Sequence, residues 1–326
     1  MRYVLGVDGG QSSTIAVVAD EDGNLLGVGA GGPANHLNEP GGPDRFRRSM
    51  TDAITGAIGG AGLVGQPMAA ACFGLTGGAA MVPEVLASIV PVGKLRIESD
   101  VVTALAAATI CRPGVIIIGG TGANAFGVNE RGEQAQAGGW GFMMGDEGSG
   151  YDIAIRGLRA AVQASDGRAP ATVLQTAIPA HFGVKDLRAE LHPLIYSGQL
   201  GRPRIASIAR VVSAAANAGD GPSLAIMAEA AGELAKDVLA VLSKLGALDS
   251  DVPVAPIGGV FKSGAPVLVP FAEAIHRRAP RVRVQVPEFP QIIGAVLLAY
   301  QDIGRTLDDA LVGRLREGLP LIERAK

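Results

Sequence analysis

The sequence predicts an α/β protein built from two related domains, and one repeated pattern carries that prediction. An apolar strand runs straight into a glycine turn at residues 4–14 and again at residues 115–124. Each copy continues with a second apolar segment, a tight turn at residues 22–23 or 131–132, and another short strand. Glycine has no Cβ, so the backbone at such a turn can approach phosphate oxygens and point N–H groups at them. Two such turns, one in each half of the chain, predict a nucleotide held in a cleft between the two domains.

Length and composition are those of a folded protein with sizeable cores. The chain has 326 residues, of which 48% are hydrophobic and 18% charged, and this argues against disorder. A net charge of −3 and the absence of a polybasic run give no reason to expect a nucleic-acid or membrane partner. Cys72 and Cys111 have neither disulfide nor metal-ligand spacing, so we expect two small buried hydrophobes in a reducing compartment. We recognise no signal peptide and no transmembrane run, and the expected location is the cytoplasm.

The expected elements of the first half follow from apolar periodicity and from glycine and proline breaks. Residues 2–29 are typical of a β-meander, and Asp44 is placed to cap a helix at residues 44–60. Four more elements are expected: a strand at 69–75, a helix at 83–90, a strand at 95–98 and a helix at 101–110. The Cys-Arg-Pro-Gly segment at 111–114 marks the expected boundary. We therefore predict an N-terminal domain at residues 1–111 and a C-terminal domain at residues 112–326.

The second half repeats the order and adds helices. A strand at 115–118 begins it, and a glycine-dense loop at 138–150 precedes a helical insertion at about 151–245. The last helix of that insertion opens at Gly221-Pro222 and closes at Gly246. The remaining expected elements are a strand at 252–257, an edge strand at 281–286, a helix at 291–300 and an amphipathic helix from 306.

The first glycine turn offers groups suited to a metal–nucleotide complex. Asp8 ends the first strand, and a carboxylate there can hold a hydrated Mg²⁺ that neutralises phosphate charge. Ser12, Ser13 and Thr14 add hydroxyls beside the backbone N–H groups. The alternative is a plain β-turn with an aspartate at its first position, which the second copy of the pattern makes less attractive.

Asp100 stands between a strand and a helix, where α/β proteins place their chemistry. A carboxylate at this point can accept the proton of a hydroxyl that attacks a γ-phosphate. The alternative interpretation is a helix N-cap, a position that aspartate favours strongly.

Two loops carry candidate ligand-binding side chains. Asn35 and His36 lie in a glycine- and proline-rich loop, where the amide can bind sugar hydroxyls or simply form a turn. Residues 138–149 surround Trp140 with glycines and end in Asp146 and Glu147, two acids that can accept hydrogen bonds from sugar hydroxyls. A structural Ω-loop is the alternative there. Gly258 follows a strand and can meet an adenine face, although glycine pairs end many strands.

These motifs together resemble a known family. The two strand–glycine-turn units and the third glycine pair resemble the phosphate-1, phosphate-2 and adenosine segments of the actin–hexokinase–heat-shock ATPase superfamily. The Gly-Gly-Trp-Gly to Gly-Asp-Glu-Gly-Ser loop at 138–149 resembles that of N-acetylglucosamine kinases, which belong to the BadF/BadG/BcrA/BcrD-type ATPase family. The resemblance extends from Asp8 to about Ala299. It implies two ribonuclease-H-like domains of the actin-like ATPase fold, with the nucleotide and substrate cleft between them.

The resemblance also implies an activity and a set of site residues. It implies an ATP- and Mg²⁺-dependent kinase acting on the 6-hydroxyl of an amino sugar, with Asp8 at the metal and Asp100 as the base. N-acetylglucosamine is the first expectation, and glucosamine, N-acetylmuramic acid and N-acetylmannosamine are competitors. The implied sugar ligands are Asn35, Thr121, Asn124, Trp140, Gly141 and Asp146. The implied nucleotide ligands are Gly9, Gly10, Gln11, Ser12, Ser13, Thr14, Gly119, Gly120, Thr121, Gly122, Gly258, Gly259 and Lys262. A homodimer through the helical C-terminal domain is expected from the resemblance alone.

The sequence departs from the family pattern at three points. Gln11 stands where glycine is frequent, Ala123 where serine is frequent, and residues 291–295 lack a glycine often found there. Two rival classes of protein would show other sequence patterns. An ATP-hydrolysing activator of a dehydratase would use cysteines for an iron–sulfur cluster, and a sugar sensor would carry a helix-turn-helix module before the first strand. The chain shows neither pattern.

Overall fold

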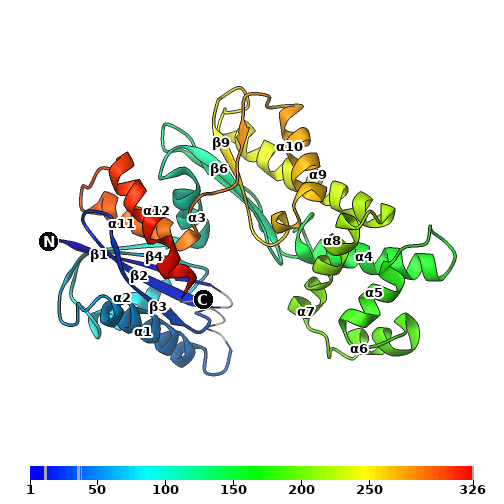
Figure 1. Cartoon of the computed structure of the whole chain (residues 1–326), viewed down its shortest axis with the longest axis horizontal. Helices are drawn as coiled ribbons and strands as arrows, with labels where there is room; N and C mark the ends of the chain where they lie inside the picture. The colour runs from blue at the N-terminus through cyan, green and yellow to red at the C-terminus, as the bar shows by residue number, and fades with distance from the viewer. Residues whose placement is uncertain (11–12, 35–36, 38, 325–326) are drawn as a thin grey trace. The chain divides into compact units, whose positions relative to one another are not determined.

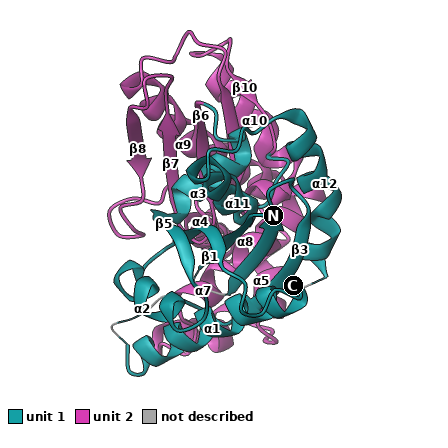
Figure 2. Ribbon diagram, turned by 90° about the vertical axis from the view of Figure 1, so that its left-hand side faces the viewer, with its two compact units in different colours: residues 1–112, 287–326 teal, residues 113–286 magenta. Residues whose placement is uncertain are grey.

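The computed structural model describes residues 1–10, 13–34, 37 and 39–324. The chain divides into two compact units, and each contains a five-stranded mixed sheet. Unit 1 comprises residues 1–112 and 287–326, and unit 2 comprises residues 113–286 (Figure 2). This confirms the predicted α/β class with two related halves.

The sheet of unit 1 has the strand order β3-β2-β1-β4-β5. Its strands are β1 (Tyr3–Gly9), β2 (Thr14–Asp20), β3 (Leu25–Gly31), β4 (Met68–Leu75) and β5 (Val92–Ser99). The first three form an antiparallel meander, whereas β4 pairs with both β1 and β5 in parallel. Its helices are α1 (Gly42–Gly60), η1 (Ala79–Met81), α2 (Val82–Ala87), α3 (Asp100–Thr109), α11 (Gln291–Asp302) and α12 (Asp309–Glu323).

Helices cover both faces of this sheet because the strands carry apolar side chains on both (Figure 1). Leu5 and Val7 of β1 join a core with Phe46 of α1, whereas Val4 joins a second core with Val296 of α11. Close packing of α11 on α3 depends on Gly294, because a Cβ there would lie 1.8 Å from the carbonyl oxygen of Thr103. The crossing of these two helices places their first residues at one edge of the sheet.

The sheet of unit 2 has the order β10-β9-β6-β7-β8. Its strands are β6 (Gly114–Gly119), β7 (Ala123–Val128), β8 (Gln134–Gly138), β9 (Pro253–Ile257) and β10 (Arg283–Val284). Its helices are α4 (Gly150–Ser165), α5 (Leu174–His181), η2 (Leu187–Leu191), α6 (His192–Tyr196), α7 (Arg202–Ala206), α8 (Ile208–Asn217), α9 (Gly221–Lys244), η3 (Phe261–Ser263) and α10 (Ala265–His276).

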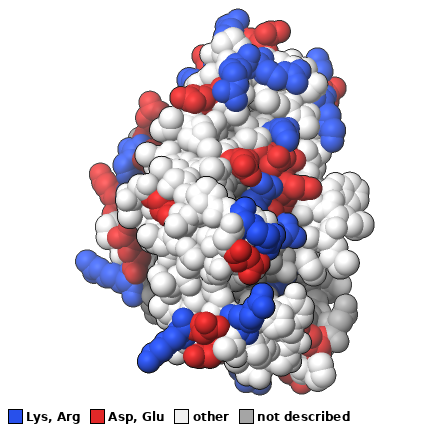
Figure 3. Space-filling view, turned by 90° about the vertical axis from the view of Figure 1, so that its right-hand side faces the viewer, with Lys and Arg blue, Asp and Glu red and all other residues white. Residues whose placement is uncertain are grey.

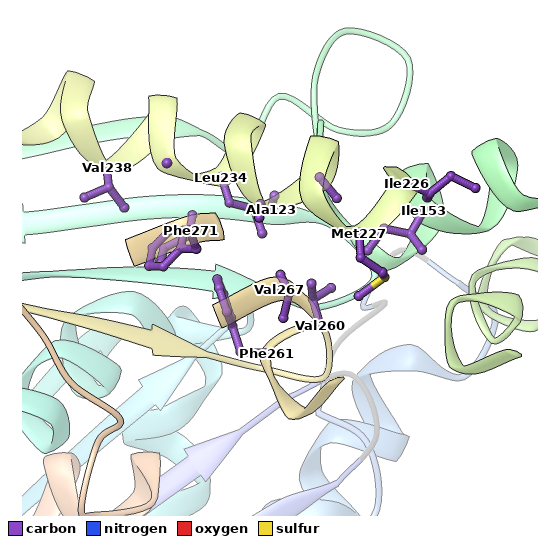
Figure 4. Close-up of a cluster of buried hydrophobic side chains, with 14 of the residues drawn as sticks. Ala123, Ile153, Ile226, Met227, Leu234, Val238, Val260, Phe261, Val267 and Phe271 are labelled. Atoms are coloured by element: carbon purple, nitrogen blue, oxygen red, sulfur yellow. The ribbon is translucent and has the colours of Figure 1, made fainter. Parts of the chain in front are cut away.

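The core of unit 2 lies between α9 and the elements around the end of β9 (Figure 4). Leu234 and Val238 of α9 are fully buried there, and the rings of Phe261 and Phe271 meet edge to face at 5.1 Å between centroids. This core fixes the ends of β6 and β9, which carry two of the predicted glycine motifs.

Most expected elements are confirmed within a few residues, and the differences have physical causes. Residues 287–326 do not belong to the second unit, because the apolar faces of α11 and α12 are buried against the sheet of unit 1. The boundary at residue 112 matches the predicted break, but the predicted range 112–326 is wrong for its last part. The prediction that Asp44 caps α1 is also wrong: the cap is Gly41, with φ of 72°, and the helix begins at Gly42. The helix α10 was not anticipated.

The face of the molecule drawn in Figure 3 shows no large area of one charge. On the face drawn in Figure 3, the Lys and Arg side chains are interspersed with Asp and Glu. Over the part of the chain that the structure describes, no helix is long and apolar enough to cross a membrane.

Candidate functional site

The first group of candidate residues lies where the parallel strands of unit 1 end. Asp8 of β1 is paired with Gly74 of β4, and α3 begins with Asp100 directly after β5. The hydroxyl of Thr76, just past β4, donates to Asp100 Oδ2 at 3.0 Å. The carboxyl ends of parallel strands meet at one edge, which explains why residues so far apart in sequence gather there.

The N-cap interpretation of Asp100 is wrong. The cap residue of α3 is Ser99, and Asp100 is the first residue of the helix. Its carboxylate therefore lies at the positive end of the α3 dipole, oriented by Thr76. A carboxylate held in this way keeps a second oxygen available for a substrate hydroxyl.

Asp8 is connected to α3 through a residue that sequence reasoning did not place. Gln291, the first residue of α11, donates from Nε2 to Asp8 Oδ1 at 3.0 Å and lies 3.5 Å from Thr103 Oγ1. Thr103 Oγ1 in turn donates to the carbonyl of Asp100 at 3.0 Å. Gly74 makes room for this hydroxyl, since a Cβ there would lie 2.3 Å from it. The sequence signal for Gln291 was only its place after a proline at the start of a helix.

The phosphate-1 turn is partly described. Gly10 N–H donates to the carbonyl of Ser13 at 3.0 Å, and Gly9 packs against Leu75, whose Cδ2 would be 2.7 Å from an added Cβ. The Thr14 hydroxyl is fully buried and donates to the Gly32 carbonyl at 2.8 Å, so it has an internal partner. The predicted ligands Gln11, Ser12 and Asn35, and also His36, lie outside the described residues.

The phosphate-2 turn and the third glycine pair lie together in unit 2. Gly120 N–H donates to the Gly122 carbonyl at 2.9 Å, and Val260 N–H donates to the Gly119 carbonyl at 2.9 Å. Gly258 has φ of 104°, and a Cβ there would lie 2.4 Å from the Gly119 oxygen. Only glycine fits this contact. The predicted phosphate and adenosine segments therefore share a backbone contact, with Gly259 open and Lys262 exposed beside it.

The glycine-rich loop between β8 and α4 is tied to this turn by Asp146. Its carboxylate is 5% exposed, and Oδ1 accepts the Ala123 N–H at 3.2 Å. Its other oxygen accepts from Arg202 Nη2 at 3.1 Å. Asp146 has φ of 64°, unusual for a residue with a side chain. The loop thus continues the phosphate-2 turn, and a Cβ on Gly122 would lie 2.8 Å from Asp146 Oδ2.

The other predicted sugar ligands surround the same loop. Asn124 of β7 pairs with Gly138 of β8, and its Oδ1 is buried without a hydrogen-bond partner among the described residues. Trp140 is 70% exposed, and Thr121 is exposed at the turn. The first turn of α4 also lies here, since Gly150 N–H donates to the Gly120 carbonyl at 2.7 Å. A buried acceptor and an exposed aromatic ring are features of a site that binds a polar ring with an apolar face.

Asp237 of α9 was missed by sequence reasoning. It lies against Gly138, where a Cβ would be 2.7 Å from Asp237 Oδ2. Burial, then the charges of Glu147, Glu233 and Asp146, raise the pKa of Asp237 to about 6. One sequence signal for Asp237 was available. It is an acid that lies next to apolar residues of α9, and those apolar residues are buried.

The described residues contain neither a reactive-looking cysteine nor a cluster of metal-ligating side chains. Cys72 is buried and Cys111 half-buried, and burial raises the pKa of both thiols, that of Cys111 to about 12. Among residues 1–10, 13–34, 37 and 39–324, no group of three His, Cys, Asp or Glu side chains could hold a metal ion.

The chain is similar to one protein family and to several sugar kinases. The sequence profile of the BadF/BadG/BcrA/BcrD ATPase family matches residues 5–299. An N-acetylmuramic acid/N-acetylglucosamine kinase of Clostridium acetobutylicum is 32% identical over 307 residues, which span 93% of this chain and 99% of that protein. A glucosamine kinase of Vibrio cholerae is 30% identical over 186 residues, which span 56% of this chain and 62% of that protein.

A solved structure shares the architecture. The crystal structure of a candidate N-acetylglucosamine kinase from Chromobacterium violaceum matches with a TM-score of 0.73 and 26% identity, covering 92% of this chain and 99% of that chain. The two sheets and these likenesses confirm the predicted fold, two ribonuclease-H-like domains of the actin-like ATPase type.

Proposed function

Because the chain belongs to the BadF/BadG/BcrA/BcrD ATPase family, we propose that it is an ATP-dependent kinase that phosphorylates the 6-hydroxyl of an amino sugar. The observation that carries this proposal is the end-to-end similarity to an N-acetylmuramic acid/N-acetylglucosamine kinase, together with a carboxylate on a helix N-terminus at the strand edge of unit 1. The use of ATP is inferred from the family. The roles of individual residues are inferred from the positions of the described side chains.

Asp100 is the proposed general base. Its Oδ2 is held by Thr76, so the carboxylate has a fixed direction and accepts the proton of the 6-hydroxyl as that oxygen attacks the γ-phosphorus. The 6-hydroxyl oxygen forms a bond to phosphorus, the bond to the β–γ bridging oxygen breaks, and ADP leaves. A positioned base of this kind contributes roughly 10²- to 10⁴-fold to a rate.

Asp8 is the proposed metal residue. Mg²⁺ prefers oxygen ligands and usually keeps several waters, taking one or two carboxylates plus the phosphates of its nucleotide. One strand-end carboxylate with a fixed Oδ1, accepting from Gln291, fits that requirement. The metal would neutralise charge on the β- and γ-phosphates. The two glycine turns are the proposed phosphate-binding segments. They comprise Gly9, Gly10, Gln11, Ser12, Ser13 and Thr14 in unit 1, and Gly119, Gly120, Thr121 and Gly122 in unit 2.

The adenosine and the sugar are assigned to unit 2. Gly258 and Gly259 would border the adenosine, with Lys262 beside them. Thr121, Asn124, Trp140, Gly141 and Asp146 would contact the sugar, together with Asn35 of unit 1. The buried and unpartnered Oδ1 of Asn124 supports this assignment, since a donor on the sugar would satisfy it.

N-acetylglucosamine is the proposed first substrate, with glucosamine and N-acetylmuramic acid as the alternatives that the relatives favour. The proposed location is the cytoplasm, and two cysteines without a disulfide are in keeping with a reducing compartment. A homodimer stays an expectation of the resemblance.

The proposal is tested by an ADP-release assay with Mg-ATP and a panel of amino sugars and glucose, including a blank without sugar. Turnover with N-acetylglucosamine above the other sugars is the expected result. Turnover with a different amino sugar alone would retain the mechanism and change the substrate. ADP release that needs no sugar would contradict the kinase proposal and favour an ATP-hydrolysing activator. Silence with every sugar would favour a sugar sensor.

A further inference from the structure

Arg202 contacts the glycine-rich loop at two points. It is the first residue of α7, and its Nη2 lies 3.1 Å from Oδ2 of Asp146. Its guanidinium carbon lies 4.7 Å from the ring centroid of Phe142, which belongs to the same loop. The Asp146 side chain is 5% exposed and that of Arg202 is 37% exposed, so solvent screens this ion pair less than a pair on the surface.

The same guanidinium also contacts α4. It lies 5.6 Å from the ring centroid of Tyr151, and the rings of Tyr151 and Phe142 meet edge to face at 5.3 Å. Cations at such distances over aromatic faces are attracted by the ring quadrupole. One side chain therefore joins α7, α4 and two residues of the loop.

The loop needs such restraints because its backbone is permissive. Gly138, Gly139, Gly141 and Gly148 all have positive φ, and Met143 is 85% exposed. Glycine at these positions removes the steric limits that would otherwise hold the chain in one conformation. Asp146 and Phe142 both have side-chain partners outside the loop, and both contact Arg202.

Arg202 has this position at a cost. Its Nε is buried and has no hydrogen-bond partner in the part of the chain that the structure describes, which is unfavourable for a charged group. A lysine would place a cation near Asp146 without burying that N–H, but it would lose the planar group that lies over Phe142. The planar contact to Phe142 is therefore what distinguishes arginine from lysine at this position.

We propose that Arg202 is a positioning residue that holds Asp146 and the loop at residues 138–147 in the shape that receives the sugar. This inference rests on the proposed function, because it takes Trp140 and Asp146 as sugar contacts. Arg202 acts through them. Its loss should weaken sugar binding more than nucleotide binding, because the Gly119 carbonyl is held by the Val260 N–H, a backbone hydrogen bond that does not involve α7.

A measurement on the ligand-free protein tests the positioning itself. Trp140 is the single tryptophan of the chain and lies in the loop, so its time-resolved fluorescence anisotropy reports loop motion on the nanosecond scale. In Arg202→Ala we expect a larger fast component than in the wild type, and in Arg202→Lys an intermediate one. The matched control is Arg204→Ala, on the same helix and over Phe182 rather than over the loop.

Steady-state kinetics test the consequence. In Arg202→Ala we expect the KM for the sugar to rise about tenfold, with the KM for Mg-ATP within about twofold of the wild type, and Arg202→Lys to recover part of the loss. Arg204→Ala should resemble the wild type. A second variant, Phe142→Leu, keeps apolar volume while removing the ring, and should change the anisotropy in the same direction if Arg202→Ala does not fold.

The outcomes separate the two proposals. Unchanged anisotropy and sugar KM in both Arg202→Ala and Phe142→Leu would overturn the positioning role. Parallel increases in both KM values, matched by Arg204→Ala, would also overturn it, because they indicate a general structural defect. If the wild type phosphorylates no sugar, the proposed function fails, and the anisotropy comparison still decides whether Arg202 restrains the loop.

Discussion

The two sheets share a plan, and their differences show where function was added. Strand for strand, β3-β2-β1-β4-β5 of unit 1 corresponds to β8-β7-β6-β9-β10 of unit 2, with the same antiparallel and parallel pairings. The correspondence reaches individual hydrogen bonds. Asp20 Oδ1 accepts from the N–H groups of Asp22 and Asn24, and Asn129 Oδ1 accepts from those of Arg131 and Glu133, all at 3.0 Å.

The first difference lies at the end of the central strand. Asp8 precedes Gly9 in β1, and the corresponding residue before Gly119 in β6 is Ile118. The acid, its partner Gln291 and the nearby Asp100 are therefore features of unit 1 alone. The scaffold does not require a carboxylate at this position, which supports a chemical role for Asp8.

The second difference lies between the third and fourth strands. Unit 1 has the single helix α1 there, whereas unit 2 has the loop at 138–149 and the helices α4 to α9. Arg202 and Asp237 come from this added segment and face the loop. The comparison teaches that unit 1 supplies the acids of the proposed reaction, and that unit 2 adds helices that shape a binding loop.

The largest expected effect is that of Asp100→Asn, which removes the proposed general base of unit 1. Asparagine keeps the shape but cannot accept the proton, so we expect kcat to fall about 10³-fold with sugar affinity within about threefold. The control is Asp309→Asn, which also changes the first residue of a helix in unit 1 and should leave kcat unchanged. Near-normal turnover of Asp100→Asn in the ADP-release assay would refute the assignment of the base.

Asp8→Asn should reduce kcat/KM for Mg-ATP about 100-fold, because a neutral amide is a poorer Mg²⁺ ligand. The amide oxygen can still accept from Gln291, so stability should change little. Ile118→Val, at the corresponding position of unit 2, should leave the kinetics unchanged. Equal losses in the two variants would show that the position matters for packing and not for the metal.

Gly258→Ala should destabilise unit 2 by about 2–3 kcal/mol, since it combines positive φ with a contact to the Gly119 oxygen. The KM for ATP should rise as the shared backbone contact of the two glycine motifs is disturbed. Gly259→Ala, with nothing within 4 Å of its added Cβ, should change stability by less than about 0.5 kcal/mol. Chemical denaturation compares the pair, and similar losses in both would contradict the close-approach explanation.

Asp237→Asn should have the smallest effect, and that effect depends on pH. The folded protein holds this proton more tightly than the unfolded chain, because the pKa rises from 3.8 to about 6. The contribution of Asp237 to the free energy of unfolding is therefore present at low pH, and it is lost as the pH rises from 3.8 through about 6. The gain in Tm from Asp237→Asn should therefore be larger at about pH 7.5 than at about pH 4. Glu229→Gln on the same helix is the control, and a gain that does not change with pH would contradict the assignment.

Sequence reasoning located what depends on local pattern. The strands, the glycine turns and the loop around Trp140 are marked by apolar runs and by residues that permit positive φ, so their positions could be predicted. The placement of Asp100 after a strand followed from the same pattern.

Long-range contacts could not be predicted in this way. Gln291 reaches Asp8 across 283 positions, and Arg202 reaches Asp146 across 56, and no periodicity relates such pairs. One feature of the sequence could have predicted that α11 packs in unit 1. Every residue from Ile292 to Tyr300 is buried, and a helix that is apolar on all sides must be covered from all sides, which a terminal appendage of unit 2 would not provide.

The most direct test of the central claim is to identify the product. Wild-type protein with Mg-ATP and N-acetylglucosamine, followed by ³¹P and ¹H NMR, shows which carbon carries the new phosphate. A phosphorus signal coupled to the two protons on C6, formed in step with ADP, is the predicted result. Phosphate at the anomeric carbon, or inorganic phosphate as the sole phosphorus product besides ADP, would contradict a kinase that uses Asp100 to activate the 6-hydroxyl.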